Sequence, residues 1–571
     1  MSNEKMGTDD QYSANNINSS EPVMPSHYVG IGASAGGLEA LLDFFTNTPA
    51  TTGAAFIVVQ HLSPDFKSFM PELLSKNTTM PIHHAADGQL VEKDTIYLIP
   101  PRKHLTLLKG VLHLEDMPHD GGLQLPIDAF FNSLAEDQQH KAIGIVLSGT
   151  GSDGSRGIRT LKEAGALIMV QNPETSKFDS MPYNVIATGL ADFILDADEI
   201  PGRLVKYLNN PLIGGGIDSL KTVIESNEDY MAQIFGLLKQ KSNIDFSQYK
   251  PSTIARRIER RMGINQLSKL KEYFSLILNT PKELQILSKE LLIGVTSFFR
   301  DQNFYSYLEK SVIDDLLDRV PMNESLRVWC AACSTGEEPY SIAMLFLEAM
   351  ERRNEIRSVK VFATDVDPEA IAFASVGKYY SDICADVHES RIKRFFSQDG
   401  DNFTISAELR QMVVFACHDL IADPPFSNIH FLVCRNALIY FQSVAQKKVL
   451  IGFHFALKKD AILFLGPSET LGELQSHFNI VNERGKIYSK QSNIRIPMGS
   501  PALRDPTAVS HHKTDSNSRE IFPLYGLVRN RREQHERSTP LNFVKDFLLQ
   551  GYVPDSIVLN EEFEALHVYG D

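Results

Sequence analysis

Cysteine and positive charge are scarce in this sequence, and it opens without a hydrophobic run. The five cysteines among 571 residues all lie in the later part of the chain, and neither their odd number nor their spacing provides a disulfide framework. The first 26 residues are polar and contain no apolar stretch of signal or membrane-spanning length. We therefore expect a cytoplasmic protein with reduced thiols and no direct membrane insertion.

The charge balance and the cysteine spacing exclude two further classes. A formal net charge of −15 argues against nucleic acid as a partner, because binding to phosphates needs an excess of Lys and Arg. Cys330 and Cys333 form a C-x-x-C pair. A structural zinc site needs a second such pair, and a redox site needs a thioredoxin-like setting, so we predict no metal centre.

What the sequence contains instead is strand and helix alternation, in two places. Strand-like runs at Tyr28–Ile31, Ala54–Gln60 and Ala142–Leu147 lead at once into glycine-rich or polar residues. This order is typical of an open parallel sheet with a site at its carboxyl edge. A second series supplies the strand candidates Arg327–Ala331, Lys360–Thr364, Val413–Ala416, Ile429–Cys434 and Ala461–Leu465.

These patterns predict an α/β fold class: two doubly wound parallel-sheet domains joined by a helical segment, then a linker and an incomplete end. Breaks near Asn209–Pro211 and Gly214–Gly216 close the first domain. A stretch rich in Pro, Ser and His after the second domain is typical of a flexible linker. The expected parts are a disordered polar N-terminus (1–25), the first sheet domain (26–208), the helical segment (217–285), the second sheet domain (286–491), the linker (492–523) and a terminal segment (524–571).

The first sheet carries a candidate nucleophile. Ser34 lies in Gly32-x-Ser34-x-Gly36, between a strand and a helix, where a sharp turn exposes a serine; the same pattern also fits a turn that binds phosphate or nothing. A nucleophilic serine needs a base and a carboxylate, and His61 and Asp153 each follow a predicted strand of this sheet. Their order differs from the Ser, Asp, His order of the α/β hydrolases. Each alone also fits a surface histidine or a turn aspartate.

Three segments together carry a family resemblance. VGIGASAGG, VVQHLSP and LSGTGSDGSRG closely resemble, in order, the nucleophile, base and acid motifs of the chemotaxis receptor methylesterase (CheB) family. The resemblance spans Ser26–Leu208. It implies Ser34 as nucleophile, His61 as general base and Asp153 as the acid that orients the base.

The resemblance also implies a reaction and a mode of control. It implies an oxyanion hole from backbone amides near Ala35 and Thr150, hydrolysis of glutamate methyl esters through an acyl-enzyme, and glutamine deamidation as a second activity. Ala35 stands where the family commonly has Thr. The receiver domain that usually begins members of the family is missing, so we expect the esterase to be controlled differently.

The second sheet offers a pocket for a cationic methyl donor. The strand Arg327–Ala331 runs into ACSTGEEPY, whose single glycine builds no pyrophosphate cradle of the G-x-G-x-x-G kind. Acidic groups suit a sulfonium cofactor: Glu337 follows this strand, and Asp365 ends another, where a carboxylate accepts hydrogen bonds from ribose hydroxyls. The same two residues also fit a helix amino-end carboxylate and a capping aspartate.

Six segments of this part resemble the chemotaxis receptor glutamate methyltransferase (CheR) family, in order: VTSFFRD, AACSTGEEPYSIA, FATDVDPEAI, HDLI, FLVCRNALIYF and FLGPSETL. The resemblance spans about Leu220–Gln491 and implies S-adenosyl-L-methionine as cofactor and receptor glutamate carboxylates as acceptors. Gly294 and Asp419 stand where Asn is common in the family. The implied cofactor-binding residues are Thr296, Arg300, Glu337, Asp365, Asp419, Leu420, Asn436 and Ala437.

The expected partners follow from this second resemblance. Arg300 is our candidate for orienting the acceptor carboxylate. A basic stripe before the second sheet fits a solvated helix face when read alone, but in the family setting it predicts docking onto an acidic receptor helix. We expect cytoplasmic helices of methyl-accepting receptors or related signalling proteins as partners, with histidine kinases as further ones. The stripe consists of Arg256, Arg257, Arg260 and Arg261, backed by Lys269 and Lys271.

The last segment of the chain resembles part of a sensory domain, and functions other than a bifunctional enzyme remain open. GYVPDSIVLNEEFEALHVYGD resembles the opening of a PAS sensory domain and stops before such a domain could finish, so we expect a fragment of a longer protein. A bifunctional adaptation enzyme would consume methyl donor unless its two sites were reciprocally controlled. The alternatives are a signalling scaffold in which one or both sites bind without turnover, and an unrelated hydrolase specificity for the first domain.

Overall fold

The computed structural model describes residues 24–61, 69–117, 124–210, 228–292, 294–400, 402–492, 556–559 and 565–569. The chain divides into two units, Met1–Ser500 and Pro501–Asp571. The polar N-terminus up to residue 23, the linker from residue 493 onward and most of the PAS-like segment lie outside the described residues. Among the helices that the structure describes, none combines the length and the apolar character needed to cross a membrane.

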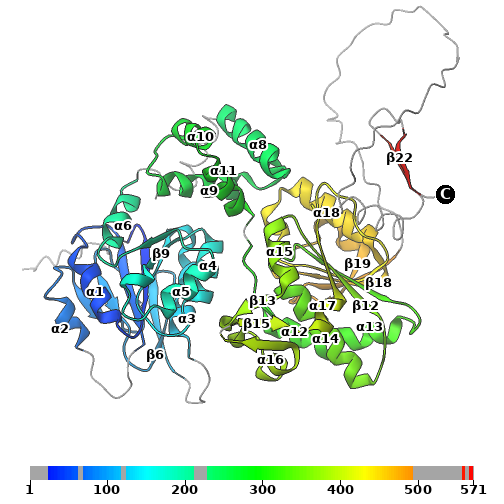
Figure 1. Ribbon diagram of the computed structural model, residues 1–571, viewed down its shortest axis with the longest axis horizontal. Helices are drawn as coiled ribbons and strands as arrows, with labels where there is room; N and C mark the ends of the chain where they lie inside the picture. Colours follow the sequence, from blue (N-terminus) through cyan, green and yellow to red (C-terminus); the bar gives the residue numbers. More distant parts are fainter. Residues whose placement is uncertain are drawn as a thin grey trace, which may run out of the picture. The chain divides into compact units, whose positions relative to one another are not determined.

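A seven-stranded sheet forms the first domain (Figure 1). Every neighbouring pair of its strands is parallel, which confirms the predicted open parallel sheet. Its strands, in spatial order, are β10 (Phe193–Leu195), β9 (Leu167–Gln171), β8 (Ala142–Val146), β1 (Tyr28–Ala33), β2 (Ala55–Gln60), β5 (Ile96–Leu98) and β3 (Ile82–His84). A small antiparallel sheet accompanies it, made of β4 (Gln89–Leu90), β7 (Val111–Asp116) and β6 (Lys103–Leu108).

Helices cover both faces of this sheet because its strands are apolar on both. Val29 and Ile31 of β1 belong to a buried cluster with α1 (Gly37–Thr46) and α6 (Ile200–Leu208). Tyr28 belongs to a second cluster, with α3 (Pro126–Gln138) and α4 (Ser155–Ala164). A Cβ atom on Gly32 would lie 2.6 Å from Cγ2 of Ile127, so glycine is what lets the first turn of α3 lie close to the end of β1. The domain also contains α2 (Met70–Leu74) and α5 (Ser180–Ala187).

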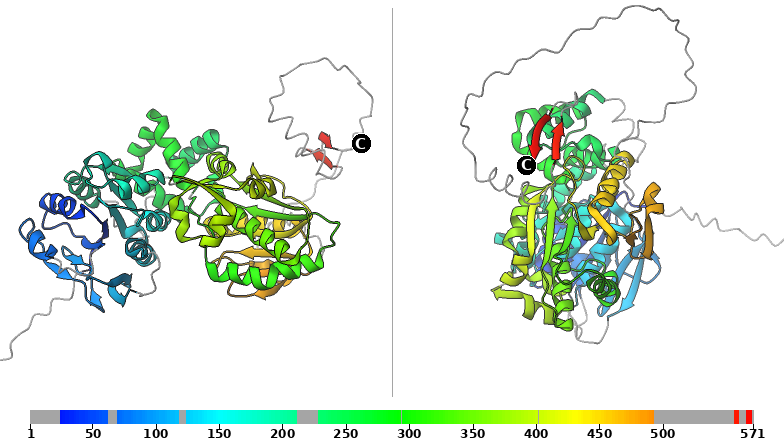
Figure 2. Two further views of the ribbon diagram at one scale, coloured as in Figure 1. Left: turned by 60° about the horizontal axis from the view of Figure 1, so that its bottom comes forward. Right: turned by 90° about the vertical axis from the view of Figure 1, so that its right-hand side faces the viewer.

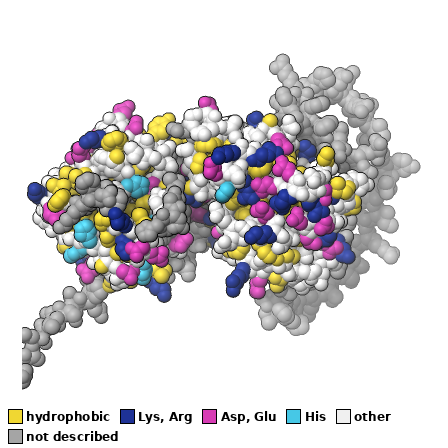
Figure 3. All heavy atoms as spheres, turned by 90° about the horizontal axis from the view of Figure 1, so that it is seen from below, with side chains coloured by type: hydrophobic (Ala, Val, Ile, Leu, Met, Phe, Trp, Pro, Cys, Tyr) yellow, Lys and Arg dark blue, Asp and Glu magenta, His cyan; other side chains and the backbone are white. Residues whose placement is uncertain are grey.

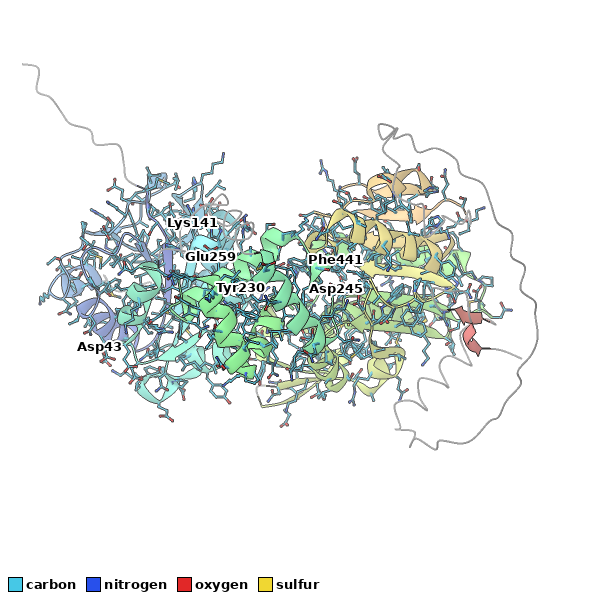
Figure 4. The ribbon with its side chains drawn as sticks, turned by 90° about the horizontal axis from the view of Figure 1, so that it is seen from above. Asp43, Lys141, Tyr230, Asp245, Glu259 and Phe441 are labelled. Atoms are coloured by element: carbon cyan, nitrogen blue, oxygen red, sulfur yellow. The ribbon has the colours of Figure 1, made fainter. Side chains whose placement is uncertain are left out.

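A helical segment with a core of its own follows. It consists of α8 (Glu228–Ser242), α9 (Pro251–Ile264), α10 (Leu270–Asn279) and α11 (Pro281–Leu291). Ile234, Phe246, Ile258, Tyr273 and Leu287 are among its buried residues. Figure 4 labels Tyr230 on α8 and Glu259 on α9 of this segment.

The basic stripe lies on α9, and three of its four arginines are not exposed. Arg257, Arg260 and Arg261 are only 5%, 4% and 7% exposed. Arg261 forms an ion pair with Glu283, and Arg260 forms one with Glu290. The prediction of an exposed docking stripe is therefore wrong, because these guanidinium groups bind carboxylates and backbone carbonyls inside the molecule. On the face drawn in Figure 3, basic and acidic side chains of the described residues are interspersed.

The second domain is built on a seven-stranded sheet of mixed direction. Five strands are parallel, in the spatial order β16 (Val413–Cys417), β12 (Val359–Asp365), β11 (Leu326–Ala331), β17 (Ile429–Cys434) and β18 (Leu457–Leu465). Two antiparallel strands, β20 (Ile487–Lys490) and β19 (Phe478–Asn482), continue the edge beyond β18. The predicted parallel sheet is thus confirmed, with an antiparallel hairpin added to it.

Both faces of this second sheet are covered as well. Val328 of β11 is buried with α13 (Ile313–Arg319) and α14 (Glu337–Arg353), whereas Trp329 is buried on the other face with α18 (Ser443–Ala456). The remaining helices of the domain are α12 (Gln302–Tyr307), α15 (Pro368–Val376), α16 (Glu389–Phe395) and α17 (Ala407–Met412). A small antiparallel sheet contains β13 (Lys378–Tyr380), β15 (Asn402–Ile405) and β14 (Phe396–Asp399).

The second unit contributes one described hairpin. β21 (Ser556–Leu559) and β22 (Ala565–Tyr569) pair antiparallel and are the two red strands of Figure 2.

Candidate active sites

Ser34 follows β1 on a tight turn that the neighbouring loop holds in place. Its backbone N–H donates a hydrogen bond of 3.0 Å to the carbonyl of Ser148, in the loop after β8. Gly36, at φ +71°, adopts the left-handed conformation before α1 begins. A Cβ atom on Gly149 would lie 2.8 Å from Cβ of Ser34, so glycine lets the loop after β8 pack directly against the serine. The turn therefore presents Ser34 at the carboxyl edge of the sheet.

His61 and Asp153 meet Ser34 at this edge, in a continuous hydrogen-bonded chain. They follow β2 and β8, the two strands that flank β1. Nδ1 of His61 lies 3.1 Å from Oγ of Ser34, and Nε2 lies 2.7 Å from Oδ2 of Asp153. A proton on Nε2 is directed to the carboxylate and leaves Nδ1 free to accept the proton of the hydroxyl. The three residues expected from the sequence are thus brought together.

Backbone amides hold the carboxylate of Asp153. Its Oδ2 accepts the N–H of Ile127 at 3.0 Å, and its Oδ1 accepts those of Asp128 and Gly154, each at 2.9 Å. Asp153 is 2% exposed, whereas the side chain of His61 is 32% exposed. The first turn of α3 therefore fixes the acid in the interior, and the imidazole links it to the surface.

Sequence reasoning missed Asp128, a second buried carboxyl group beside Asp153. Its Oδ1 accepts the N–H of Gly157 at 2.7 Å. Burial, followed by the nearby charge of Asp153, raises the pKa of Asp128 to about 8. Asp128 is therefore mostly protonated at pH 7, which avoids two adjacent buried anions. The signal in the sequence was a single aspartate within the apolar run of α3.

Most of the predicted cofactor residues line one cavity at the carboxyl edge of the second sheet. The cavity, including its open mouth, encloses about 970 Å³. The predicted residues among its lining end β12, follow β16 and β17 or come from the loop between α11 and α12. Seven predicted residues line it: Thr296, Arg300, Asp365, Asp419, Leu420, Asn436 and Ala437.

The polar groups of this cavity fit a methyl donor with a sulfonium charge and ribose hydroxyls. Asp365 accepts the N–H groups of Ser334 at 2.7 Å and Asp367 at 2.9 Å, and burial raises its pKa. Within the described part of the chain, Oδ1 of Asn436 is buried and accepts no hydrogen bond, so it is available to a ligand. Asp419 uses its Oδ1 to accept the N–H of Ile421 at 2.7 Å.

Glu337 lies in an adjoining cavity. It begins α14 and accepts a hydrogen bond of 2.7 Å from the hydroxyl of Thr335. Burial raises its pKa, and the nearby charge of Arg159 opposes that effect. The adjoining cavity shares Thr296 and Arg300 with the first one, so the two open into each other along the loop before α12.

A buried network that the sequence did not reveal supports this loop. Arg435 is 6% exposed and donates to the carbonyl of Arg300 at 2.9 Å. It also pairs with Glu338 and Asp301, and the hydroxyl of Tyr305 donates to Glu338 at 3.0 Å. The carbonyl of Arg300 is thus anchored from the interior, while its guanidinium donates to the carbonyl of Val295 at 3.0 Å and pairs with Glu163.

One residue of the first domain also lines the cofactor cavity. This residue is Glu163, in the last turn of α4, and its Oε2 lies 3.1 Å from Nη2 of Arg300. Its Oε1 accepts a hydrogen bond of 3.3 Å from the hydroxyl of Tyr440. Tyr440 lies in the FLVCRNALIYF segment, but sequence reasoning did not single it out. Figure 4 labels Phe441, which follows it in the chain.

Both expected resemblances are found as matches to protein-family models. Residues 29–204 match "CheB methylesterase", residues 229–292 match "CheR methyltransferase, all-alpha domain", and residues 294–487 match "CheR methyltransferase, SAM binding domain". The first match contains the Ser34, His61 and Asp153 chain, and the third contains the cofactor cavity. The fold and the two sites define an enzyme with two different α/β catalytic domains, of which the second binds S-adenosylmethionine.

Curated relatives agree with this division. A chemotaxis protein methyltransferase of Listeria innocua is 33% identical over 235 residues, which cover 41% of this chain and 87% of that protein. A protein-glutamate methylesterase/protein-glutamine glutaminase of Burkholderia orbicola is 36% identical over 178 residues, covering 31% of this chain and 52% of that protein. The chain belongs to the chemotaxis protein methyltransferase family and carries a CheB methylesterase domain in front of the methyltransferase part.

One relative matches across both domains. It is a 104.1 kDa protein encoded in the hypE 3' region of Rhodobacter capsulatus, 36% identical over 524 residues, which cover 88% of this chain. The chain spans 53% of the length of that relative. The combination of the two domains therefore recurs in a longer protein.

Proposed function

We propose that this protein is a bifunctional receptor-adaptation enzyme. Its first domain (26–208) removes methyl groups from glutamate methyl esters of a receptor, and its second part (217–285 and 286–491) adds them with S-adenosylmethionine as donor. One observation carries the proposal. The same polypeptide contains Ser34, His61 and Asp153 joined by hydrogen bonds and, separately, a cavity lined by the residues predicted to bind the methyl donor.

The hydrogen bonds of the first site support ester hydrolysis. Nδ1 of His61 takes the proton of Ser34 as Oγ attacks the ester carbonyl, and Asp153 stabilises the imidazolium that forms. Amides near Ala35 and Thr150 stabilise the oxyanion of the tetrahedral intermediate. His61 then returns the proton to the departing methanol, and water hydrolyses the acyl-enzyme by the same steps to leave a carboxylate.

Glutamine deamidation is part of this proposal as a second reaction of the same site. Attack of Ser34 on the side-chain amide of glutamine produces the same acyl-enzyme, with ammonia in place of methanol as the leaving group. The name of the Burkholderia relative, which includes glutaminase, supports this addition.

The cavity of the second domain supports methylation of a glutamate carboxylate. When bound, S-adenosylmethionine supplies an electrophilic methyl group. The acceptor carboxylate is already ionised at neutral pH and needs alignment more than a base. We assign this alignment to Arg300, whose guanidinium lies at the wall of the cavity, and to Tyr440 beside it, while Asp365 and Asn436 bind the donor.

The proposed substrates are cytoplasmic helices of methyl-accepting receptors, and histidine kinases are proposed signalling partners. The names of the two relatives, a chemotaxis protein methyltransferase and a protein-glutamate methylesterase, support a protein glutamate of a chemotaxis system as the substrate. The PAS-like character of residues 524–571 rests on the sequence resemblance alone. A scaffold that binds without turnover would not need a histidine held between a serine and a buried carboxylate, and that arrangement favours the enzyme.

An assay with one label and two readouts tests the proposal. Purified protein is incubated with methyl-labelled S-adenosylmethionine and receptor-bearing membranes, and base-labile protein methylation and released methanol are recorded for the parent chain and for Ser34→Ala. We expect more protein methylation and less methanol with the variant. Methanol release that Ser34→Ala leaves unchanged would remove the esterase assignment. Absence of labelled protein with both versions, despite donor binding, would remove the methyltransferase assignment for this receptor.

A further inference from the structure

Helix α4 of the esterase domain lies against the methyltransferase domain with one charged face. Arg156, Arg159 and Glu163 are spaced by three and four residues, which places them on the same side of the helix. Arg159 forms an ion pair of 3.0 Å with Asp382, and Arg156 forms one with Asp386. These two pairs fix the helix against the second domain on one side of the cavity.

The third residue of this face enters the cavity itself. One side-chain nitrogen of Arg300, Nη2, lies 3.3 Å from Oε1 and 3.1 Å from Oε2 of Glu163, so the guanidinium contacts both carboxylate oxygens. The hydroxyl of Tyr440 adds a third contact to Oε1. From behind, Arg257 of α9 donates to the carbonyls of Lys162 at 3.0 Å and Glu163 at 2.8 Å, which holds the end of α4 in place.

We infer that Glu163 occupies the acceptor position of the methyltransferase site, as an internal counterpart of the receptor glutamate. The inference rests on the proposed function, since it assumes that Arg300 and Tyr440 receive the acceptor. Glu163 has the side chain of the proposed acceptor, contacts both of these residues and lines the donor cavity. A receptor glutamate must therefore displace Glu163 before it is methylated.

A purely structural ion pair explains these contacts less well. The side chains of Glu163 and Arg300 are 20% and 28% exposed, and pairs this accessible to water contribute little to stability. The Arg156 and Arg159 pairs already join the same two surfaces. The Arg156 and Arg159 pairs line only the adjoining cavity, whereas the Glu163 pair also lines the donor cavity, where it affects access of another carboxylate.

Before a receptor binds, the two sites differ in whether their substrate position is occupied. Among the residues that the structure describes, the lining of the methyltransferase cavity does not include Ser34, His61 or Asp153. With Glu163 in place, the esterase site is assembled and the acceptor site of the methyltransferase is filled. The chain therefore favours demethylation until a receptor competes for Arg300, which limits wasteful consumption of the methyl donor.

Kinetics of receptor methylation test the inference. All proteins are full chains carrying Ser34→Ala, so that the esterase does not remove the label, and initial rates are measured against receptor concentration. Glu163→Gln retains the size of the side chain and removes its charge. We expect the apparent KM for the receptor to fall roughly three- to tenfold with kcat little changed, because the competent fraction of the site rises.

A matched control removes the same charge elsewhere. Glu174 is an exposed residue of the esterase domain outside α4, and Glu174→Gln should leave KM unchanged. An unchanged or higher KM for Glu163→Gln, in a protein whose melting temperature equals that of the parent, would overturn the inference.

Carboxyl labelling separates failure of the inference from failure of the proposed function. The full chain is treated with a water-soluble carbodiimide and a small amine, and labelling of Glu163 and Glu174 is quantified by mass spectrometry. We expect Glu163 to be protected, and Arg300→Ala to remove that protection. Protection of Glu163 without any receptor methylation would support its place in the cavity while rejecting the methyltransferase assignment. Methylation together with free labelling of Glu163 would reject the inference alone.

Discussion

The esterase and methyltransferase sites lie at equivalent edges of two parallel sheets, but they are completed in different ways. The described residues of the esterase site come from its own domain, and three backbone amides hold its acid. The methyltransferase cavity is lined in part by Glu163 of the other domain, beside the Arg300 that we propose binds the acceptor. A site built within one domain is ready for its substrate, whereas a site completed across a domain contact depends on that contact.

The esterase site has a preorganised acid, whereas the methyltransferase site depends on whether its acceptor position is accessible. Backbone amides cannot move away from Asp153 without unfolding of α3, so the esterase is expected to respond mainly to changes in its own residues. The guanidinium of Arg300 is a side chain whose partner is provided by another domain, and it is expected to respond to changes on both sides.

The largest expected effect is that of Asp153→Asn on the esterase. The amide no longer stabilises the imidazolium and favours the wrong tautomer of His61, so methanol release should fall by roughly 10⁴-fold. Receptor methylation by the same protein should change less than twofold. A similar loss of both activities would mean that the two sites are not independent in the way we describe.

The next largest effect is expected on stability, from removal of the ion pairs of Arg260. Arg260→Met removes the guanidinium partner of the buried Asp192 and one of two such partners of Glu290, which keeps Arg261 at 3.3 Å. Loss of one partner of a buried ion pair costs about 3–5 kcal/mol, so we expect a clearly lower melting temperature by calorimetry. Lys162 still contacts Asp192 at 2.7 Å, and a melting temperature equal to that of the parent would mean that this lysine suffices.

A smaller effect is expected at the acceptor side of the methyltransferase. Arg300→Ala removes the charge-assisted hydrogen bonds that we propose to the acceptor carboxylate. Such bonds are worth about 1.5–3 kcal/mol each, so kcat/KM for receptor methylation should fall about a hundredfold. Arg300→Lys retains the charge and loses the planar fork, and should recover only part of the activity. Full activity of the lysine variant would show that charge alone is sufficient.

A gradual effect, small at each pH step, is a change in the pH dependence of stability at the esterase core. The folded chain holds the proton of Asp128 up to about pH 8, whereas the unfolded chain releases it near its ordinary pKa of 3.8. This contribution to stability is fully present below about pH 4 and is lost as the pH rises through 8, by at most about 1.4 kcal/mol per pH unit. Asp128→Asn cannot ionise, so its melting temperature should decline less between pH 5 and 8. Parallel curves for the two proteins would contradict the raised pKa.

Much of the fold was predictable from the sequence because the strands are short, apolar and followed at once by their special residues. The predicted strand Ile429–Cys434 agrees with β17 end to end, and Tyr28–Ile31 differs from β1 by two residues. The antiparallel hairpin of β19 and β20 was not predicted, since periodicity within a strand carries no information on the direction of its neighbours.

The parts of the sites that were missed depend on contacts between distant segments. Arg257, Arg260 and Arg261 have the spacing of an exposed basic face, and their burial follows from carboxylates and carbonyls that lie far away in the sequence. Glu163 is an unremarkable helix residue until the second domain lies beside it. Local patterns predicted which residues follow each strand, but not which side chain of one domain enters the cavity of the other.

Helix α4 has a consequence for how the two activities are linked. Asp153 lies two residues before its first residue and Glu163 lies one residue before its last, so about 15 Å of helix connects the acid of one site to the acceptor position of the other. A helix of three turns moves as a rod. Suppose that a receptor bound at Arg300 displaces α4 and thereby changes the affinity of the Ser34 site for an ester by some factor. Thermodynamic reciprocity then requires that an ester bound at Ser34 change the affinity for the receptor at Arg300 by the same factor.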